Sequence, residues 1–118
     1  MLRRKVPGPY TFILPATRLV PDLVLRRQKT VGIRIPDSAV ALALVRRLEH
    51  PLISTSAGTP GGEILIDAKD IKEQLGHGLE LILDGGYKPN EPSSVIDLSG
   101  PEPVVLRAGK GDVSDLVS

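Results

Sequence analysis

Cysteine is absent from the 118-residue sequence. Disulfide bonds, thiolate nucleophiles and cysteine-ligated zinc are therefore excluded, and a reducing compartment is permitted. Tryptophan is absent too, and only Tyr10, Phe12 and Tyr87 are aromatic. We therefore expect a core of Leu, Ile, Val and Ala side chains, and stacking of nucleic-acid bases on aromatic side chains is disfavoured.

Long apolar runs are also missing. No stretch of the sequence reaches the length of a membrane span, and the first ten residues lack the apolar run of a signal peptide. These absences predict a cytoplasmic protein with no membrane partner. With 41% hydrophobic and 25% charged residues, the chain has the composition of one small globular domain.

Acidic residues are scarce in the first part of the chain. Residues 1–50 contain ten Lys or Arg and three Asp or Glu, whereas residues 51–118 contain five and eleven, and the net charge is +1. A basic surface of this kind suits phosphate groups, and an ordinary solvated surface is the other interpretation.

The common catalytic and metal-binding motifs are missing as well. The glycine cluster Gly58–Gly62 lacks the lysine of a Walker-type phosphate loop. His50 and His77 lie far apart in the sequence, and Asp67 with Asp70 is more simply explained as a helix cap than as a catalytic pair. No nucleophile elbow supports a serine hydrolase triad. We therefore assign no catalytic residue and no metal ligand.

Hydrophobic periodicity predicts an α/β protein. Residues 1–9, with Pro-Gly-Pro at their end, predict an extended entry rather than a helix. Strands are predicted at 10–14 and around 31–35, where three apolar residues alternate with Gly32 and Arg34 and place Arg34 on the opposite face. A short helix is predicted from Pro21.

The clearest helix is predicted at Ser38–Leu48, with Asp37 as its cap and an apolar stripe that covers the sheet. A strand at 51–56 follows it, so a strand, a helix and a strand predict a crossover with a parallel strand pair. The remaining predicted elements are a helix at Ala68–Leu75 capped by Asp67 and closed by Gly76, an antiparallel pair of strands at 94–98 and 103–107, and a short helical turn from Asp112. Residues 79–84 fit a strand or a helix, and a strand is favoured.

Two kinds of residue suggest a site for a small anion. The hydroxyl residues 54–56 end a predicted strand, and ligands bind beyond strand ends in open α/β sheets. A turn whose hydroxyls satisfy local backbone groups is the alternative interpretation. Arg34 and Arg107 suit carboxylate or phosphate groups, although Arg34 is equally explained by a surface salt bridge.

Six segments carry a specific resemblance. They are PGPYTFILPAT, KTVGIRIPDSAVALALVRRL, PLISTSAG, LILDGG, PSSVIDLS and VVLRAG. In this order and spacing they resemble the YrdC-like family, which comprises the threonylcarbamoyl-AMP synthases and their YciO-type relatives. The resemblance covers nearly the whole chain and implies a twisted, open mixed α/β sheet with flanking helices around a broad cleft.

The resemblance implies a nucleotidyltransferase that joins L-threonine, bicarbonate and ATP into threonylcarbamoyl-AMP and pyrophosphate, for the modification of an adenosine in certain tRNAs. ATP would be a substrate, and Mg²⁺ would accompany the leaving pyrophosphate. By the same resemblance, Arg34, Ser54 and Ser93 would bind threonine, and Thr30, Ser56, Ile64 and Arg107 would bind ATP.

The resemblance also implies two departures from the family. Residues 1–118 would form a partial domain, because the matched segments belong to the C-terminal portion of the family domain. The preceding basic element that holds the nucleotide phosphates would be absent, and residues 3–5 do not match it. Gly58 stands where the synthases usually have Asn, which indicates a looser loop or the YciO-like branch.

Two further functions are open at this point. A non-catalytic YrdC- or YciO-like module would bind tRNA or double-stranded RNA through the basic residues of the first 50 positions. A structural fragment would pair with a second copy as a homodimer or with a complementing N-terminal segment, because a truncated sheet leaves an uncovered edge.

Overall fold

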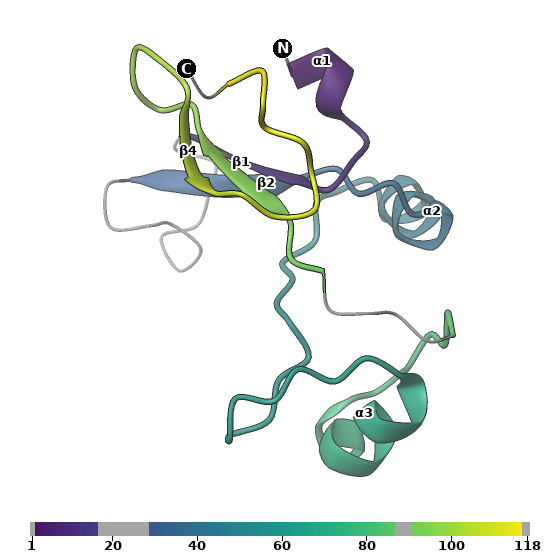
Figure 1. Ribbon diagram of the computed structural model, residues 1–118. Helices are drawn as coiled ribbons and strands as arrows, with labels where there is room; N and C mark the ends of the chain where they lie inside the picture. The colour runs from purple at the N-terminus through teal and green to yellow at the C-terminus, as the bar shows by residue number, and fades with distance from the viewer. Residues whose placement is uncertain (1, 17–28, 87–90, 117–118) are drawn as a thin grey trace. The chain divides into compact units, whose positions relative to one another are not determined.

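The computed structural model describes residues 2–16, 29–86 and 91–116. The chain divides into two compact units, each of which is described by itself (Figure 1). The sheet unit comprises residues 1–53 and 92–118, and the α3 unit comprises residues 54–91.

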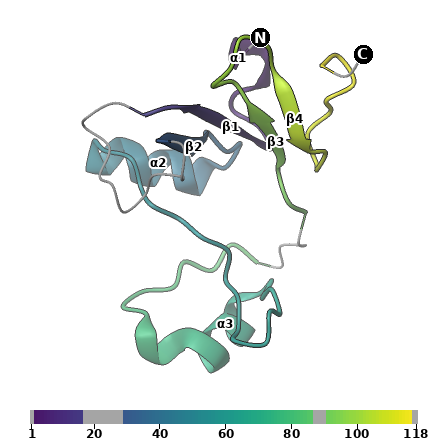
Figure 2. The ribbon, with the colours of Figure 1, turned by 90° about the vertical axis from the view of Figure 1, so that its left-hand side faces the viewer.

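Four strands form the sheet unit's mixed sheet in the order β2-β1-β3-β4 (Figure 2). Strand β1 pairs antiparallel with β2 and parallel with β3, and β3 pairs antiparallel with β4. An open mixed α/β sheet was predicted and is confirmed. The strands are β1 Tyr10–Pro15, β2 Thr30–Arg34, β3 Ser94–Asp97 and β4 Val104–Arg107.

The core of the sheet unit lies along the two central strands. Phe12 and Ile13 of β1 are both buried although they face opposite sides of the sheet, and Ile96 of β3, which is opposite Phe12, is fully buried. The edge strands keep large apolar side chains exposed, among them Ile33 of β2 and Leu106 of β4. In the described part of the sheet unit, the buried apolar side chains therefore lie on the strands that have a neighbour on each side.

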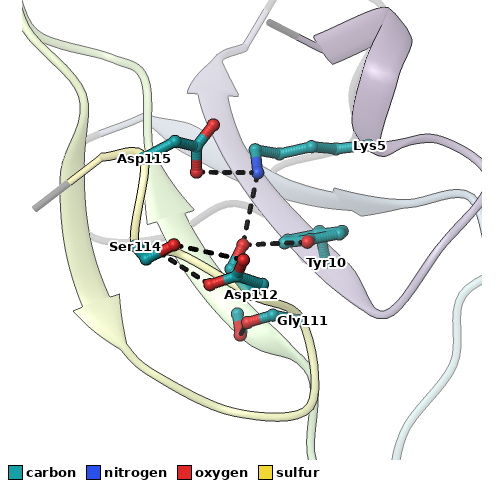
Figure 3. A network of polar contacts seen from close by, with 7 residues as sticks. Lys5, Tyr10, Gly111, Asp112, Ser114 and Asp115 are labelled. Atoms are coloured by element: carbon teal, nitrogen blue, oxygen red, sulfur yellow. Dashed lines mark hydrogen bonds and ion pairs between the residues drawn. The ribbon is translucent and has the colours of Figure 1, made fainter.

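A short helix, α1 Leu2–Lys5, begins the chain where the sequence predicted an extended entry. That prediction was wrong because it weighed only local signals, whereas Lys5 makes contacts with the distant C-terminal residues. Its ammonium group donates to the carbonyl oxygen of Asp112 at 3.2 Å and lies 3.1 Å from a carboxylate oxygen of Asp115 (Figure 3). The same nitrogen lies 4.8 Å from the centre of the Tyr10 ring, a cation–π distance.

Tyr10 and Gly111 complete this link between the ends of the chain (Figure 3). The Tyr10 hydroxyl donates to the carbonyl oxygen of Asp112 at 2.9 Å. A side chain at position 111 would collide with the Tyr10 ring, so only glycine permits this close approach. Lys5 therefore makes a structural contact between the two ends of the sheet unit.

Helix α2 spans Ala39–Leu48, close to the prediction, but Ser38 rather than Asp37 is its cap. The Ser38 hydroxyl accepts a hydrogen bond from the backbone N–H of Ala41 at 3.3 Å, the geometry of an N-cap. The predicted cover for the sheet is not formed: none of the ten helical residues is buried, and Val40 is 57% exposed. The apolar stripe alone did not determine what the helix packs against.

Helix α3 Ala68–Leu75 begins at Asp67 as predicted. The Asp67 carboxylate accepts a hydrogen bond from the backbone N–H of Asp70 at 2.9 Å, and the 3₁₀ turn η2 Gly76–Gly78 follows the helix. This cap could be predicted because it depends on residues three positions apart.

The two strands predicted at 51–56 and 79–84 are not formed. Leu52, Ile53 and Leu81 are exposed, and neither segment pairs with a strand within the described ranges. The predicted crossover is therefore wrong, and the parallel pair of the sheet is β1 with β3 instead. A strand requires the backbone of a partner, which an apolar run does not supply by itself.

Three observations complete the fold. The helix predicted from Pro21 and the aromatic residue Tyr87 lie outside the described residues. Beyond Asp112 the chain makes a turn in which the N–H of Leu116 donates to the carbonyl of Val113 at 2.9 Å, as expected for a short final turn. Within the described part of the chain, no helix is long and apolar enough to cross a membrane.

Candidate functional site

One row of residues crosses all four strands of the sheet. Arg34 lies opposite Thr11, Thr11 lies opposite Val95, and Val95 lies opposite Arg107. Directly opposed residues in a sheet present their side chains on the same face. The Val95–Arg107 pair lies at a register shift of the β3–β4 pairing, but Arg107 bonds Ser93, whose hydroxyl contacts Thr11, so the two arginines of the edge strands share one face with Thr11 between them.

Arg107 is held on this face by Ser93. Its Nε donates to the carbonyl oxygen of Ser93 at 2.9 Å, and its Nη2 donates to the Ser93 hydroxyl at 3.3 Å. The Ser93 hydroxyl also lies 2.7 Å from the hydroxyl of Thr11. We call Thr11, Ser93 and Arg107 the hydroxyl–arginine cluster. Ser93 is only 5% exposed, whereas Arg107 is exposed and retains guanidinium N–H groups for a ligand.

The loop after β4 is hydrogen-bonded to the residues around Ser93. The backbone N–H of Lys110 donates to the carbonyl of Pro92 at 2.9 Å, and the N–H of Gly109 donates to the hydroxyl of Ser94 at 2.9 Å. The Ser94 hydroxyl in turn donates to the carbonyl of Gly111 at 2.5 Å. A side chain at Gly109 would collide with the carbonyls of Pro92 and Ser93, so the Arg-Ala-Gly segment needs glycine there.

Strand β2 contributes two of the predicted residues to the same face. Thr30 and Arg34 lie at a period of two along the strand, with Gly32 between them. Thr30 is buried and Arg34 is exposed. A Cβ at Gly32 would lie 3.4 Å from the methyl group of Thr11. Glycine therefore places no side chain on the sheet face beside Thr11.

The remaining predicted residues, Ser54, Ser56 and Ile64, belong to the α3 unit. Ser54 and Ser56 are exposed and lie in no strand, so the predicted strand end is absent. A tight turn follows them, in which Gly58 pairs with Ile64 and the N–H of residue 65 donates to the carbonyl of residue 57 at 2.8 Å. The structure thus groups Thr30, Arg34, Ser93 and Arg107 on one face and places Ser54, Ser56 and Ile64 in the other unit.

The face carries the two guanidinium groups and, by the strand register, the carboxylate of Asp97, whose side chain accepts hydrogen bonds from Ser99. Among the described residues, neither Arg34 nor Arg107 forms an ion pair with a carboxylate, so the surface salt bridge considered for Arg34 is not formed there. Hydrogen bonds from the N–H and then the hydroxyl of Ser114 lower the pKa of Asp112, but this carboxylate lies in the C-terminal turn and is not part of the row that holds the two arginines.

A divalent cation finds no protein ligand set in the described part of the chain. No three His, Asp or Glu side chains gather there as metal ligands. The Mg²⁺ that the resemblance implies would be bound mainly by the phosphates of ATP; it stays a prediction, and we assign no chemical step to it.

A shallow cavity of about 140 Å³ lies in the α3 unit. None of the seven predicted site residues lines it. Its walls are largely apolar, and they are formed by Leu65, Ile66, Asp67, Ala68, Ile71, Ile82, Leu83, Asp84, Gly85 and Gly86.

Sequence reasoning missed Thr11 and Gly109. Thr11 was counted only as part of a strand, and its hydroxyl is significant because the parallel pairing of β1 with β3 brings it to Ser93. The available signal for Gly109 was its position two residues after Arg107, where a loop must turn back toward the sheet.

Residues 1–109 match the family model of the Sua5, YciO and YrdC proteins, which is described as telomere recombination. The chain belongs to this family. The uncharacterized protein YciO of Escherichia coli K12 is 43% identical over 115 residues, which are 96% of this chain and 56% of that protein. The threonylcarbamoyl-AMP synthase of Chromobacterium violaceum is 40% identical over 98 residues, 82% of this chain and 50% of the synthase.

Solved structures of relatives agree with the fold. The crystal structure of E. coli YciO is 42% identical, has a TM-score of 0.89 and is matched over 98% of this chain and 57% of its own. The structure of Sua5 from Pyrococcus abyssi complexed with L-threonine is 33% identical, with a TM-score of 0.86, and is matched over 96% of this chain and 34% of its own. The chain therefore spans about half the length of these two curated relatives.

Proposed function

We propose that this member of the family binds L-threonine and ATP on the sheet face that carries Arg34 and Arg107, and contributes to the synthesis of threonylcarbamoyl-AMP from threonine, bicarbonate and ATP. One observation carries the proposal: the row across the sheet brings two arginines and the Ser93–Thr11 hydroxyl pair to a single face. The threonine-bound structure of the 33% identical Sua5 supports threonine as one ligand.

The two arginines suit two different anionic groups. Three strand spacings of ~4.8 Å separate the backbones of β2 and β4 by roughly 14 Å, and Arg107 reaches back toward β3 to bond Ser93. In our proposal Arg34 binds the threonine carboxylate through its planar fork, and Arg107 binds a phosphate of ATP.

The remaining residues complete the two pockets in this proposal. On the sheet face, Ser93 would contact threonine and Thr30 the nucleotide; the threonine role of Ser54 and the ATP roles of Ser56 and Ile64, all in the α3 unit, rest on the family resemblance alone. Catalysis is then mainly positioning: threonine, once carbamoylated, is held against the α-phosphate, and fixed donors stabilise the charge that develops there.

The test is titration calorimetry on the folded 118-residue chain, with threonine and with ATP in the presence of MgCl₂. We expect saturable binding of at least one ligand. Absence of heat for both at millimolar concentration, with folding verified by circular dichroism, would refute the proposal.

A second assay separates binding from turnover. Pyrophosphate release from ATP is measured with threonine and bicarbonate together and with each omitted. Release that requires both co-substrates assigns the reaction to these 118 residues. Binding without release assigns to them the ligand sites alone, and a segment equivalent to the unmatched part of YciO, added in trans, then tests for complementation.

The RNA-binding alternative stays a prediction with its own test. A non-catalytic module predicts binding of tRNA or double-stranded RNA that needs no nucleotide and weakens steeply as salt increases. Binding that is equal at low and physiological salt would count against it.

A further inference from the structure

We propose that Thr11 is a positioning residue, whose hydroxyl orients the Ser93 hydroxyl and through it the Arg107 guanidinium. The ligand part of this inference rests on the proposed function, whereas the orientation of Arg107 is a property of the chain itself. Thr11 is absent from the residues that the family resemblance implies, and it enters through the 2.7 Å contact with Ser93.

The protons of the cluster can be counted. A guanidinium only donates, so the Ser93 oxygen accepts the hydrogen bond from Arg107 Nη2. Between Ser93 and Thr11 either hydroxyl can donate, and the pair holds two protons for one mutual hydrogen bond. One O–H is therefore left over for a ligand. An anion on this face favours the arrangement in which the free proton points to it and the other hydroxyl proton stays between Thr11 and Ser93.

The orientation of Thr11 is fixed from both sides. Its hydroxyl contacts Ser93, which precedes β3, and its methyl group points toward Gly32 on β2, where a Cβ would lie 3.4 Å away. A β-branched side chain has a strongly restricted χ1 angle. Threonine thus places a polar atom toward one neighbouring strand and an apolar atom toward the other, which neither serine nor valine does.

This division of roles supplies matched variants. Thr11→Val keeps the methyl contact and the shape but removes the hydroxyl, whereas Thr11→Ser keeps the hydroxyl and removes the methyl. A purely structural role for Thr11 predicts that valine, the closer match in volume, is tolerated better than serine. A positioning role predicts the reverse order.

The first measurement needs no ligand. Arg107 Nε–H donates to the Ser93 carbonyl, so its NMR signal and its hydrogen exchange rate report on the orientation of the guanidinium. We expect T11V to shift this signal and to speed its exchange, and T11S to restore both. An unchanged Arg107 signal in folded T11V would overturn the proposal. If T11V does not fold, Thr11→Ala serves in its place, because a smaller side chain introduces no collision.

The second measurement connects the cluster to the ligand. With ATP and MgCl₂ as the probe, T11V should weaken binding by roughly 2- to 12-fold, as expected for one neutral hydrogen bond, and T11S should bind ATP more tightly than T11V and close to the wild type. In an R107Q background, T11V should cause no further loss. An equal loss in both backgrounds would show that Thr11 does not act through Arg107.

The two measurements keep the inference separate from the proposed function. A wild-type chain that binds neither threonine nor ATP refutes the proposed function, and the Arg107 signal then still decides whether Thr11 positions the guanidinium. If the wild-type chain binds its ligands but the Arg107 signal does not respond to T11V, the proposed function is supported and the positioning role of Thr11 is overturned.

Discussion

Replacement of Arg34 by Gln removes the guanidinium that we assign to the threonine carboxylate. Hydrogen bonds to charged groups contribute about 1.5–3 kcal/mol, and 1.4 kcal/mol corresponds to a tenfold change in affinity. Because Arg34 is exposed on an edge strand, solvent screens its interactions and the lower part of this range applies. We therefore expect R34Q to weaken threonine binding by about 10- to 30-fold.

Two comparisons make the Arg34 prediction specific. R34K keeps the charge but loses the planar fork, so we expect an intermediate loss of about 3- to 10-fold. R46Q removes the same charge from the last turn of α2, which lies outside the proposed site, and should leave threonine affinity within about twofold.

Titration calorimetry of threonine at constant ionic strength measures all three variants, and circular dichroism verifies that each is folded. ATP affinity of R34Q should remain within about twofold, because ATP is assigned to other residues. Equal losses in R34Q and R46Q would refute the reasoning, since the effect would then follow net charge rather than position in the row.

Three further predictions concern stability and tolerance. Ile96→Ala should cost about 2–5 kcal/mol in denaturant unfolding because Ile96 is fully buried, whereas Leu44→Ala on α2 should cost below about 1 kcal/mol. Gly58→Asn should leave the melting temperature unchanged or slightly raised, because its φ is not positive and a Cβ there meets only ordinary contacts at 3.7 and 3.8 Å. The pKa of Asp112 is lowered from its ordinary value of 3.8, so the carboxylate stays ionised in the folded chain at pH values somewhat below 3.8. Its contribution to the free energy of unfolding is therefore fully present above pH 3.8 and is lost as the pH falls through the lowered pKa. The difference in unfolding free energy between wild type and D112N should therefore shrink below pH 3.8.

Each of these predictions has a clear contrary result. A loss for L44A as large as that for I96A would show that the exposed face of α2 is covered in solution. A melting temperature lowered by several degrees in G58N would show that the turn requires glycine. A difference between wild type and D112N that grows toward low pH would contradict the direction of the Asp112 pKa shift.

Local sequence signals determined the elements that depend on near neighbours. The β-branched and aromatic runs of β1, β3 and β4 and the Asp67 cap of α3 were predicted close to where they lie, because side-chain alternation and capping involve residues a few positions apart. The position of Arg34 on the face opposite Ile33 also follows from the period of two.

Only the tertiary structure decided the pairing of strands and the content of the site. The apolar runs at 51–56 and 79–84 have the composition of strands, but they find no partner among the described residues and remain outside the sheet. In the same way, α1 forms where Lys5 contacts residues that follow it by more than one hundred positions.

The same reasoning applies to the site. Arg34 and Arg107 were candidates from the sequence, whereas their common face requires β1 to lie between β2 and β3. Thr11 became a functional candidate only because that order brings its hydroxyl to Ser93, 82 residues away. A residue's alternation along a strand is local and can be read from the sequence, but its neighbours across the sheet are set by backbone hydrogen bonds between distant segments.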